Sequence, residues 1–338
     1  MRFSACLMSV ILCLVCQAEK KPDAPHNPAP GLHLKLIRTI DLNKSKGQID
    51  ELVELPDGGF LVRDSTFDPL QSQSVEVYSH SGTLLRTIGR FGKEPGRYYA
   101  LNKIAFSRRH NVVWVGDMMG RISRFDLSGR LIDTVLLQKP GYHPDDIVLD
   151  EERDRYYVTG CVALHFYLDL GCQIVHEYEL STNKYIRSFL ETDPEAVAKK
   201  YFGIENYQIG VAPAGQLYAI DSPIPKLWKI VPGSKVESFP VPSKVIERIP
   251  ELDPTKDNSN VGAQHYLLHK LVVANRTVIL SASKKGPDGN FLEVFSFDGR
   301  PIALDVPAPG LLLGKSPRDT LWFAQRSPSG FRVAEYSY

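Results

Sequence analysis

The chain has 338 residues, a formal net charge of +1 and 43% hydrophobic residues. The composition is typical of a soluble globular protein, and the length suits two ordinary domains or one large all-β domain. The near-zero charge argues against nucleic acid as a partner, because no basic excess is present to neutralise phosphates.

Residues 1–18 have the features of a signal peptide. Arg2 provides the positive end, residues 7–15 are apolar, and Cys16 and Ala18 place small residues at the −3 and −1 positions of a cleavage site. The apolar run is too short for a transmembrane helix. The alternative, a buried N-terminal strand, does not fit the polar segment that follows.

Residues 19–31 form a polar, Pro-rich linker. A lipid anchor at Cys16 is an alternative to cleavage, although Leu14 and Val15 lack the small residue that lipoprotein processing prefers. In either case we expect a protein located outside the cytoplasm, secreted or periplasmic, and monomeric.

Two cysteines, Cys161 and Cys172, lie outside the leader. In an exported protein an even pair predicts a disulfide, which would close a small loop and stabilise it by about 2–3 kcal/mol. Two buried free thiols are the alternative. The residues between the cysteines are mostly apolar, which fits either a lip over a binding site or a long hairpin.

A β-hairpin pattern recurs along the chain. Residues 75–89 alternate between apolar and polar on both sides of a turn with Gly82. Equivalent turns follow at Gly129, Asn183, Gly233 and Gly299, at separations of 47, 54, 50 and 66 residues. A second hairpin pattern precedes each one. The repeat is therefore four antiparallel strands, named A to D in chain order.

The last repeat has only three strands, and its third covers residues 331–336. A spare strand lies at the other end, where residues 36–40 echo residues 84–88 of a D strand. The sequence therefore predicts an all-β, six-bladed β-propeller over residues 32–338, in which the N-terminal strand completes the last blade. Two separate β-sandwiches would not explain this split repeat.

Residues 60–104 resemble the NHL repeat of six-bladed propellers. The resemblance is carried by strand B endings at 62–64, 115–117 and 219–221, by the Tyr/Phe-x-x-x-Gly turn, and by the Gly-rich segment 87–98. It covers two blades well and fades after Gly160. It implies the fold but not the activity, because such propellers include lyases, lactonases and binding modules.

The predicted connections are unequal on the two faces of the propeller. The A–B and C–D turns are short, whereas the B–C loops 65–74, 160–173 and 282–290 and the D–A loops 89–101, 191–206 and 241–269 are long. Because B–C and D–A loops share one face, we expect the functional site there. Drift in loop length without a ligand is the alternative.

Five residues are candidates for the rim of this face: Asp64, Asp117, Asp221, His165 and Arg326. The three aspartates end equivalent B strands, where they would accept backbone N–H groups of the loops or, alternatively, hold Ca²⁺. His265 and His269 have a spacing compatible with Zn²⁺ on a helix, but the segment leads into a predicted strand. No cofactor or metal site is predicted.

Two functions fit these features. The first is an exported binding module whose B–C/D–A face binds a peptide, glycan or protein partner. The second is a metal-dependent lyase or lactonase-type hydrolase with its site on the propeller axis. We favour binding, because no nucleophile motif, phosphate loop or strong zinc spacing is present.

Overall fold

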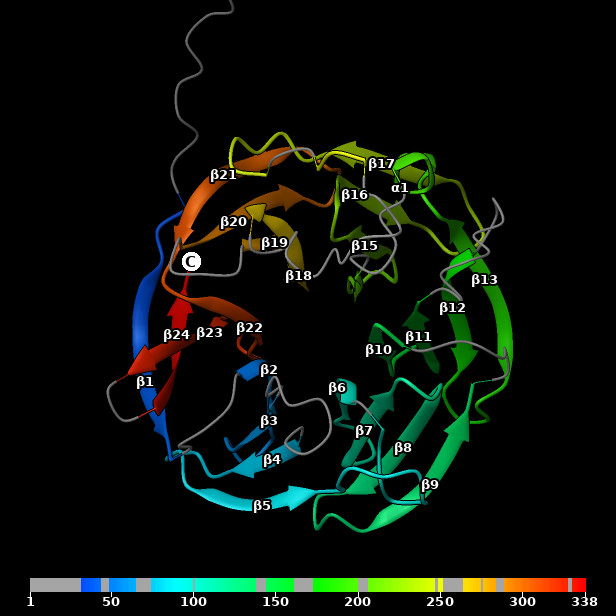
Figure 1. Cartoon of the computed structure of the whole chain (residues 1–338), viewed down its shortest axis with the longest axis vertical. Helices are drawn as coiled ribbons and strands as arrows, with labels where there is room; N and C mark the ends of the chain where they lie inside the picture. Colours follow the sequence, from blue (N-terminus) through cyan, green and yellow to red (C-terminus); the bar gives the residue numbers. More distant parts are fainter. Residues whose placement is uncertain are drawn as a thin grey trace, which may run out of the picture. The chain divides into compact units, whose positions relative to one another are not determined.

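The computed structural model describes residues 32–43, 49–64, 74–99, 101–137, 144–160, 173–199, 206–246, 249–251, 264–274, 276–283, 289–327 and 330–338. Within these residues the strands form six four-stranded sheets arranged as a ring (Figure 1). Five sheets follow the chain as simple meanders, and the sixth combines the last three strands with the first. The predicted propeller of four-stranded antiparallel blades is confirmed.

Each blade runs from its innermost strand A to its outermost strand D. Blade 1 consists of β2 (Ile49–Glu54), β3 (Phe60–Asp64), β4 (Ser74–Tyr78) and β5 (Leu84–Ile88). Blade 2 consists of β6 (Leu101–Ser107), β7 (Val112–Asp117), β8 (Arg121–Asp126) and β9 (Leu131–Leu136). Blade 3 consists of β10 (Asp146–Asp150), β11 (Arg155–Thr159), β12 (Gln173–Glu179) and β13 (Tyr185–Glu191). Blade 4 consists of β14 (Tyr207–Val211), β15 (Leu217–Asp221), β16 (Ile224–Ile230) and β17 (Val236–Pro240). Blade 5 consists of β18 (Leu267–Val273), β19 (Thr277–Ser283), β20 (Asn290–Ser296) and β21 (Pro301–Ala308). Blade 6 consists of β22 (Leu311–Lys315), β23 (Leu321–Ser327), β24 (Gly330–Ser337) and β1 (Lys35–Leu42).

The N-terminal strand β1 closes the ring as predicted. It pairs antiparallel with β24, for example Ile40 with Val333, and so supplies strand D of blade 6. Figure 1 shows this pair, blue beside red, at the outer edge of the ring. Closure by strands from both ends of the chain ties the first and last blades together and leaves no seam in the ring.

The turn at Gly82 has a second role in this closure. Gly82 has a φ of +85° and donates its N–H to the Ser79 carbonyl, as the hairpin pattern requires. A Cβ at this position would lie only 2.2 Å from the carbonyl oxygen of Asp41 in β1. Glycine is therefore required both by the backbone conformation and by the close approach of β1.

The hydrophobic core is divided among the blade interfaces. Each of the six buried apolar clusters combines residues of two neighbouring blades, and together the clusters include every blade pair around the ring. Aromatic pairs lie between blades: Phe60 with Trp322, Trp114 with Tyr156, and Tyr218 with Phe297. The core is therefore shared between neighbouring blades, and separating any two of them would expose part of it.

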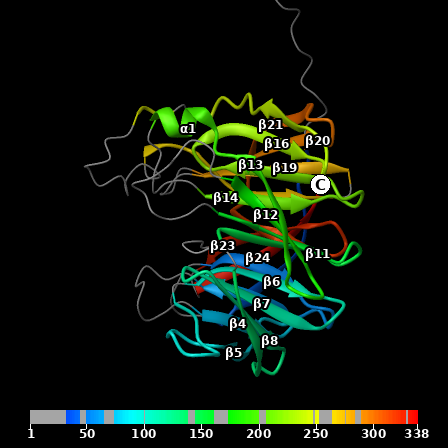
Figure 2. The same ribbon diagram turned by 90° about the vertical axis from the view of Figure 1, so that its right-hand side faces the viewer.

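The two faces differ as expected. All A–B and C–D connections are short, such as residues 55–59 and 79–83, whereas the D–A connection 241–266 is the longest in the chain. Helix α1 (Pro194–Lys199) lies in the D–A connection between blades 3 and 4 and stands on this face in the turned view of Figure 2. Its predicted cap is present, since Asp193 Oδ1 accepts the Glu195 N–H at 2.9 Å.

Candidate functional site

The three rim aspartates occupy equivalent places in their blades. Asp64, Asp117 and Asp221 each pair with the first residue of strand A, namely Ile49, Leu101 and Tyr207. All three are buried. They therefore lie at the B–C/D–A ends of blades 1, 2 and 4, beneath the face on which we expect the site.

Asp117 holds two loops of this face together. Its Oδ2 accepts the Tyr99 N–H of the D–A loop at 3.0 Å, and its Oδ1 accepts the Met119 N–H of the B–C turn at 2.9 Å. Arg121 pairs with Asp117 and donates to the carbonyl oxygens of Gly92 and Lys93. Because the pair is nearly buried, the two loops have a fixed mutual geometry.

The braced loops present an apolar surface, which we call the dimethionine patch: Met118, Met119, Phe91 and Tyr99. Met118 is 51% exposed and Met119 is 53% exposed. The rings of Phe91 and Tyr99 lie 5.3 Å apart, and Met118 donates its N–H to the Tyr99 carbonyl. The patch therefore joins the B–C turn of blade 2 to the D–A loop before it.

The position of the dimethionine patch is unusual in this molecule. Among the described residues, the other exposed large apolar side chains lie on D strands, except for Val231, which lies in a C–D turn. Arg90 and Lys93 are exposed beside the patch, and Lys93 Nζ lies 5.5 Å from the centre of the Tyr99 ring. Glu94, also exposed on this loop, pairs with Arg97 at 3.3 Å. The surface is thus apolar at its centre, and its margin carries a net positive charge.

A second polar feature lies on the propeller axis. The inner strands contact one another around the ring, from β2 through β6, β10, β14, β18 and β22 back to β2 (Figure 1). Glu51 of β2 accepts from Lys103 of β6 at 2.5 Å and from Lys270 of β18 at 3.0 Å. Lys103 also contacts Asp146 of β10 at 2.8 Å. We call Glu51, Lys103, Asp146 and Lys270 the axial cluster.

Backbone amides fix the two acids of the axial cluster. Glu51 Oε2 accepts the Ile104 N–H at 3.1 Å, and Asp146 Oδ2 accepts the Ile209 N–H of the next blade at 2.9 Å. The four charged side chains come from blades 1, 2, 3 and 5 and are all nearly buried. They lie near the beginning of the A strands, which is the end toward the B–C/D–A face.

Charge interactions set the protonation states in this cluster. Burial alone would raise the pKa of Glu51, but Lys103, Lys270 and Arg63 outweigh it and lower the pKa to about 2. Burial tends to lower the pKa of Lys103, yet Asp146 and Glu51 raise it. For Lys270 burial prevails over the attraction of Glu51, with Lys103 adding repulsion, and the pKa falls to about 8.

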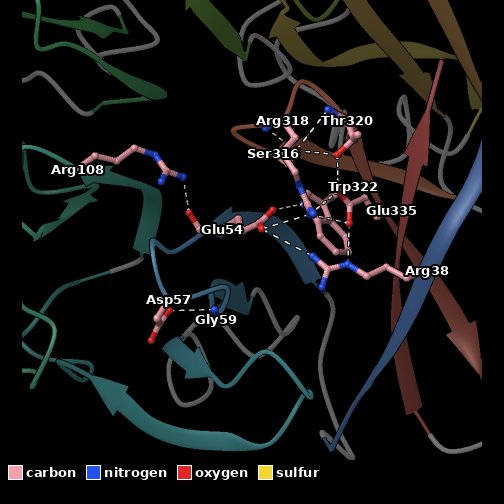
Figure 3. Close-up of polar contacts among 10 residues, drawn as sticks. All are labelled: Arg38, Glu54, Asp57, Gly59, Arg108, Ser316, Arg318, Thr320, Trp322 and Glu335. Carbon is pink, nitrogen blue, oxygen red and sulfur yellow. Dashed lines mark hydrogen bonds and ion pairs between the residues drawn. The ribbon is translucent and has the colours of Figure 1, made fainter.

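A third polar cluster belongs to ring closure rather than to the B–C/D–A face. Figure 3 shows Arg38, Arg318 and Thr320 directed toward Glu335. Their donor atoms lie 2.6, 2.8 and 2.5 Å from its carboxylate oxygens. Glu335 is fully buried. Glu54, in blade 1, accepts from Trp322 Nε1 at 3.2 Å, so the cluster joins β1, blade 6 and blade 1.

The remaining predicted residues are not brought into one site. Arg326 is exposed on β23, in blade 6, opposite Phe331. His265 precedes β18 and His269 lies within it, so the helical spacing for zinc does not apply. Within the described ranges no three His, Cys, Asp or Glu side chains gather into a metal-binding group. His165, Cys161, Cys172, Cys16 and the segments 1–18 and 19–31 lie outside the described residues.

The sequence held a signal for the axial cluster that motif reasoning missed. Glu51, Lys103 and Lys270 are charged residues at the third or fourth position of their A strands. A charged side chain that faces the axis from the innermost strand must find partners there, because burial without a partner is costly. The repeat alone thus indicated an axial charge group, although not its pairing.

Comparisons with solved structures support the fold. A member of the DUF4221 family from Bacteroides vulgatus is similar with a TM-score of 0.63 and 10% identity, over 90% of this chain and 98% of that chain. A candidate exported protein from Bacteroides fragilis has a TM-score of 0.61 and 12% identity, over 90% and 95%. Virginiamycin B lyase from Staphylococcus aureus has a TM-score of 0.53 and 11% identity, over 90% and 100%.

These likenesses establish the propeller fold and leave the family undecided. No protein-family model matches the chain, and no curated protein matches its sequence. The NHL resemblance therefore stands at the level of the fold. None of the helices in the described part of the chain is long and apolar enough to cross a membrane.

Proposed function

We propose that this chain is an exported binding module that captures a protein partner on its B–C/D–A face. The dimethionine patch is the anchor. The partner segment carries an apolar side chain that packs between Met118, Met119 and Tyr99, and acidic residues that face Arg90 and Lys93.

The observation that carries this proposal is a pair of half-exposed methionines next to two loops whose backbones are held by the buried Asp117 and Arg121 side chains. Methionine is flexible and polarizable, so it fits varied apolar side chains. The Asp117–Arg121 pair holds the backbone of both loops, which reduces the ordering that binding requires. A flexible side chain on a fixed backbone suits recognition of a protein segment better than recognition of a polar glycan.

Export is part of the proposal. The leader at residues 1–18 would be removed or, with Cys16 lipidated, would leave an anchor at the start of the 19–31 linker. The likeness to a candidate exported protein agrees with this location. In either form the propeller would present its face outside the cytoplasm.

The double variant Met118→Ser/Met119→Ser tests the anchor. We expect the partner that copurifies with the full chain from the producing cells to fall at least tenfold, because buried anchors at an interface are worth about 2 kcal/mol or more. The matched control is Ile132→Ser, which removes an equally exposed apolar side chain from strand D of blade 2. Equal retention by the double variant and the wild type would contradict the proposal.

The alternative, a metal-dependent lyase or lactonase-type hydrolase, draws on the shared fold with virginiamycin B lyase. A fold of this kind supports many activities, so it favours neither function. Metal analysis of the purified full chain separates the two. A stoichiometric, tightly bound metal on the axis would contradict a purely binding role.

A further inference from the structure

The axial cluster has more hydrogen-bond donors than its acids can satisfy. Lys270 shares one oxygen, Glu51 Oε1, with Lys103, and within the described residues no other acceptor contacts its ammonium group. Arg63 of β3 points at the same carboxylate, with Nε 3.7 Å from Glu51 Oε2. Its Nε is buried and has no hydrogen-bond partner among the described residues.

His269 lies next to these cations. It occupies the bulge between Leu268 and Lys270 in β18, and its Nδ1 is buried without a hydrogen-bond partner in the described part of the chain. Burial, together with the charges of Lys270, Arg63 and Lys103, lowers the pKa of His269 to about 4. The surroundings of this ring are therefore electropositive.

The acids near these donors cannot supply the missing hydrogen-bond acceptors. Glu51 and Asp146 are fixed by the amides of Ile104 and Ile209, and Asp146 contacts Lys103 rather than Lys270. Asp50 pairs with the far side of Arg63, at 3.6 Å from a terminal nitrogen. Buried polar groups in native proteins almost always have partners, so unmatched donors on one side of a cluster indicate an acceptor that the described residues do not supply.

We propose that Lys270, Arg63 and His269 form an axial binding site for the carboxylate group of a ligand. This site goes beyond the partner-binding patch and does not depend on it. The carboxylate accepts from the Lys270 ammonium group and the Arg63 Nε–H, while His269 donates from Nδ1 in the matching tautomer.

The charges favour a monoanion. Lys103 and Lys270 balance Glu51 and Asp146, and Arg63 balances Asp50. The cluster is thus close to neutral, so a single negative charge that accepts from three donors costs less to bury than a double one. A phosphate dianion would bring a second negative charge toward Glu51, with no further cation to offset it.

Saturation-transfer NMR with acetate tests the site in the full-length protein at pH 7.5 and constant ionic strength. We expect saturation to reach the acetate methyl protons in the wild type and to be lost in Lys270→Met. Lys315→Met is the control, because Lys315 is an exposed lysine at the opposite end of an A strand and pairs with Asp319. It should retain the wild-type signal.

Three further comparisons keep the test decisive. N-acetylglycine should displace acetate and its amide should not, and inorganic phosphate should displace acetate less well than N-acetylglycine. If Lys270→Met does not fold, Arg63→Gln removes a second donor of the site and should weaken the signal at least threefold. No signal in the wild type, equal signal in Lys270→Met, or displacement by the amide would overturn the proposal.

Discussion

The Glu51→Gln variant is expected to lower the free energy of unfolding by about 3–5 kcal/mol at pH 7, the usual cost of breaking a buried ion pair. The substitution would leave Lys270 with no anionic contact among the described residues, and Lys103 would keep only Asp146. Both lysines are nearly buried, so a neutral amide in place of the carboxylate would leave their charges poorly compensated. Urea unfolding followed by tryptophan fluorescence measures the difference.

The stabilisation that Glu51 provides should weaken as the pH falls. The folded-state pKa of Glu51 is about 2, below its ordinary value of 4.5, so its stabilisation is present above pH 4.5 and is lost as the pH falls toward 2. The difference between the wild type and Glu51→Gln should therefore shrink over this range. Glu237→Gln is the matched control, since Glu237 is half-exposed and lies 3.6 Å from Lys229. A difference of less than about 1 kcal/mol for Glu51→Gln would contradict the buried-pair account.

The Glu335→Gln variant is expected to lower the free energy of unfolding by about 2–4 kcal/mol, because charge-assisted hydrogen bonds from two arginines are lost at a buried site. Glu335 accepts from Arg38 of β1 and from Arg318 and Thr320 of blade 6. The loss should appear first at the closure, so amide exchange in β1 should quicken more than exchange in β11.

A control for closure lies on the same strand pair. Asp41 of β1 accepts from Arg332 of β24 at 2.8 Å, but both side chains are solvent-accessible. Asp41→Asn should therefore change stability little, because exposed ion pairs contribute little. If Asp41→Asn and Glu335→Gln were equally destabilising, burial of Glu335 would not be the source of its effect.

The fold was predictable because each blade repeats its own local chemistry. The turn residues Gly82, Gly129, Gly233 and Gly299 all have positive φ, and Asn183 takes the same conformation at φ +59°. These residues mark a hairpin wherever they occur between alternating strands. The N-terminal closure was predictable for a different reason: the three-stranded last repeat required a fourth strand, and residues 36–40 resembled one.

The site was less predictable because its contacts join distant residues. Glu51 and Lys270 are 219 positions apart, and no spacing rule connects them. Asp117 was found because it ends a strand in the repeat, but its pairing with Arg121 and the exposure of Met118 and Met119 depend on how the 91–99 loop folds back. Repetition identifies positions in a blade, whereas a binding site arises from what differs between blades.

Site-specific photocrosslinking in the producing cells tests the central claim most directly, namely that the B–C/D–A face binds a protein partner. A photoreactive side chain at position 119 should give one discrete crosslinked protein, and the same group at position 81, in a C–D turn on the opposite face, should give none. The crosslink at 119 should also fade when Arg90 and Lys93 are replaced by glutamate. A crosslink from position 81 with none from position 119 would contradict the account.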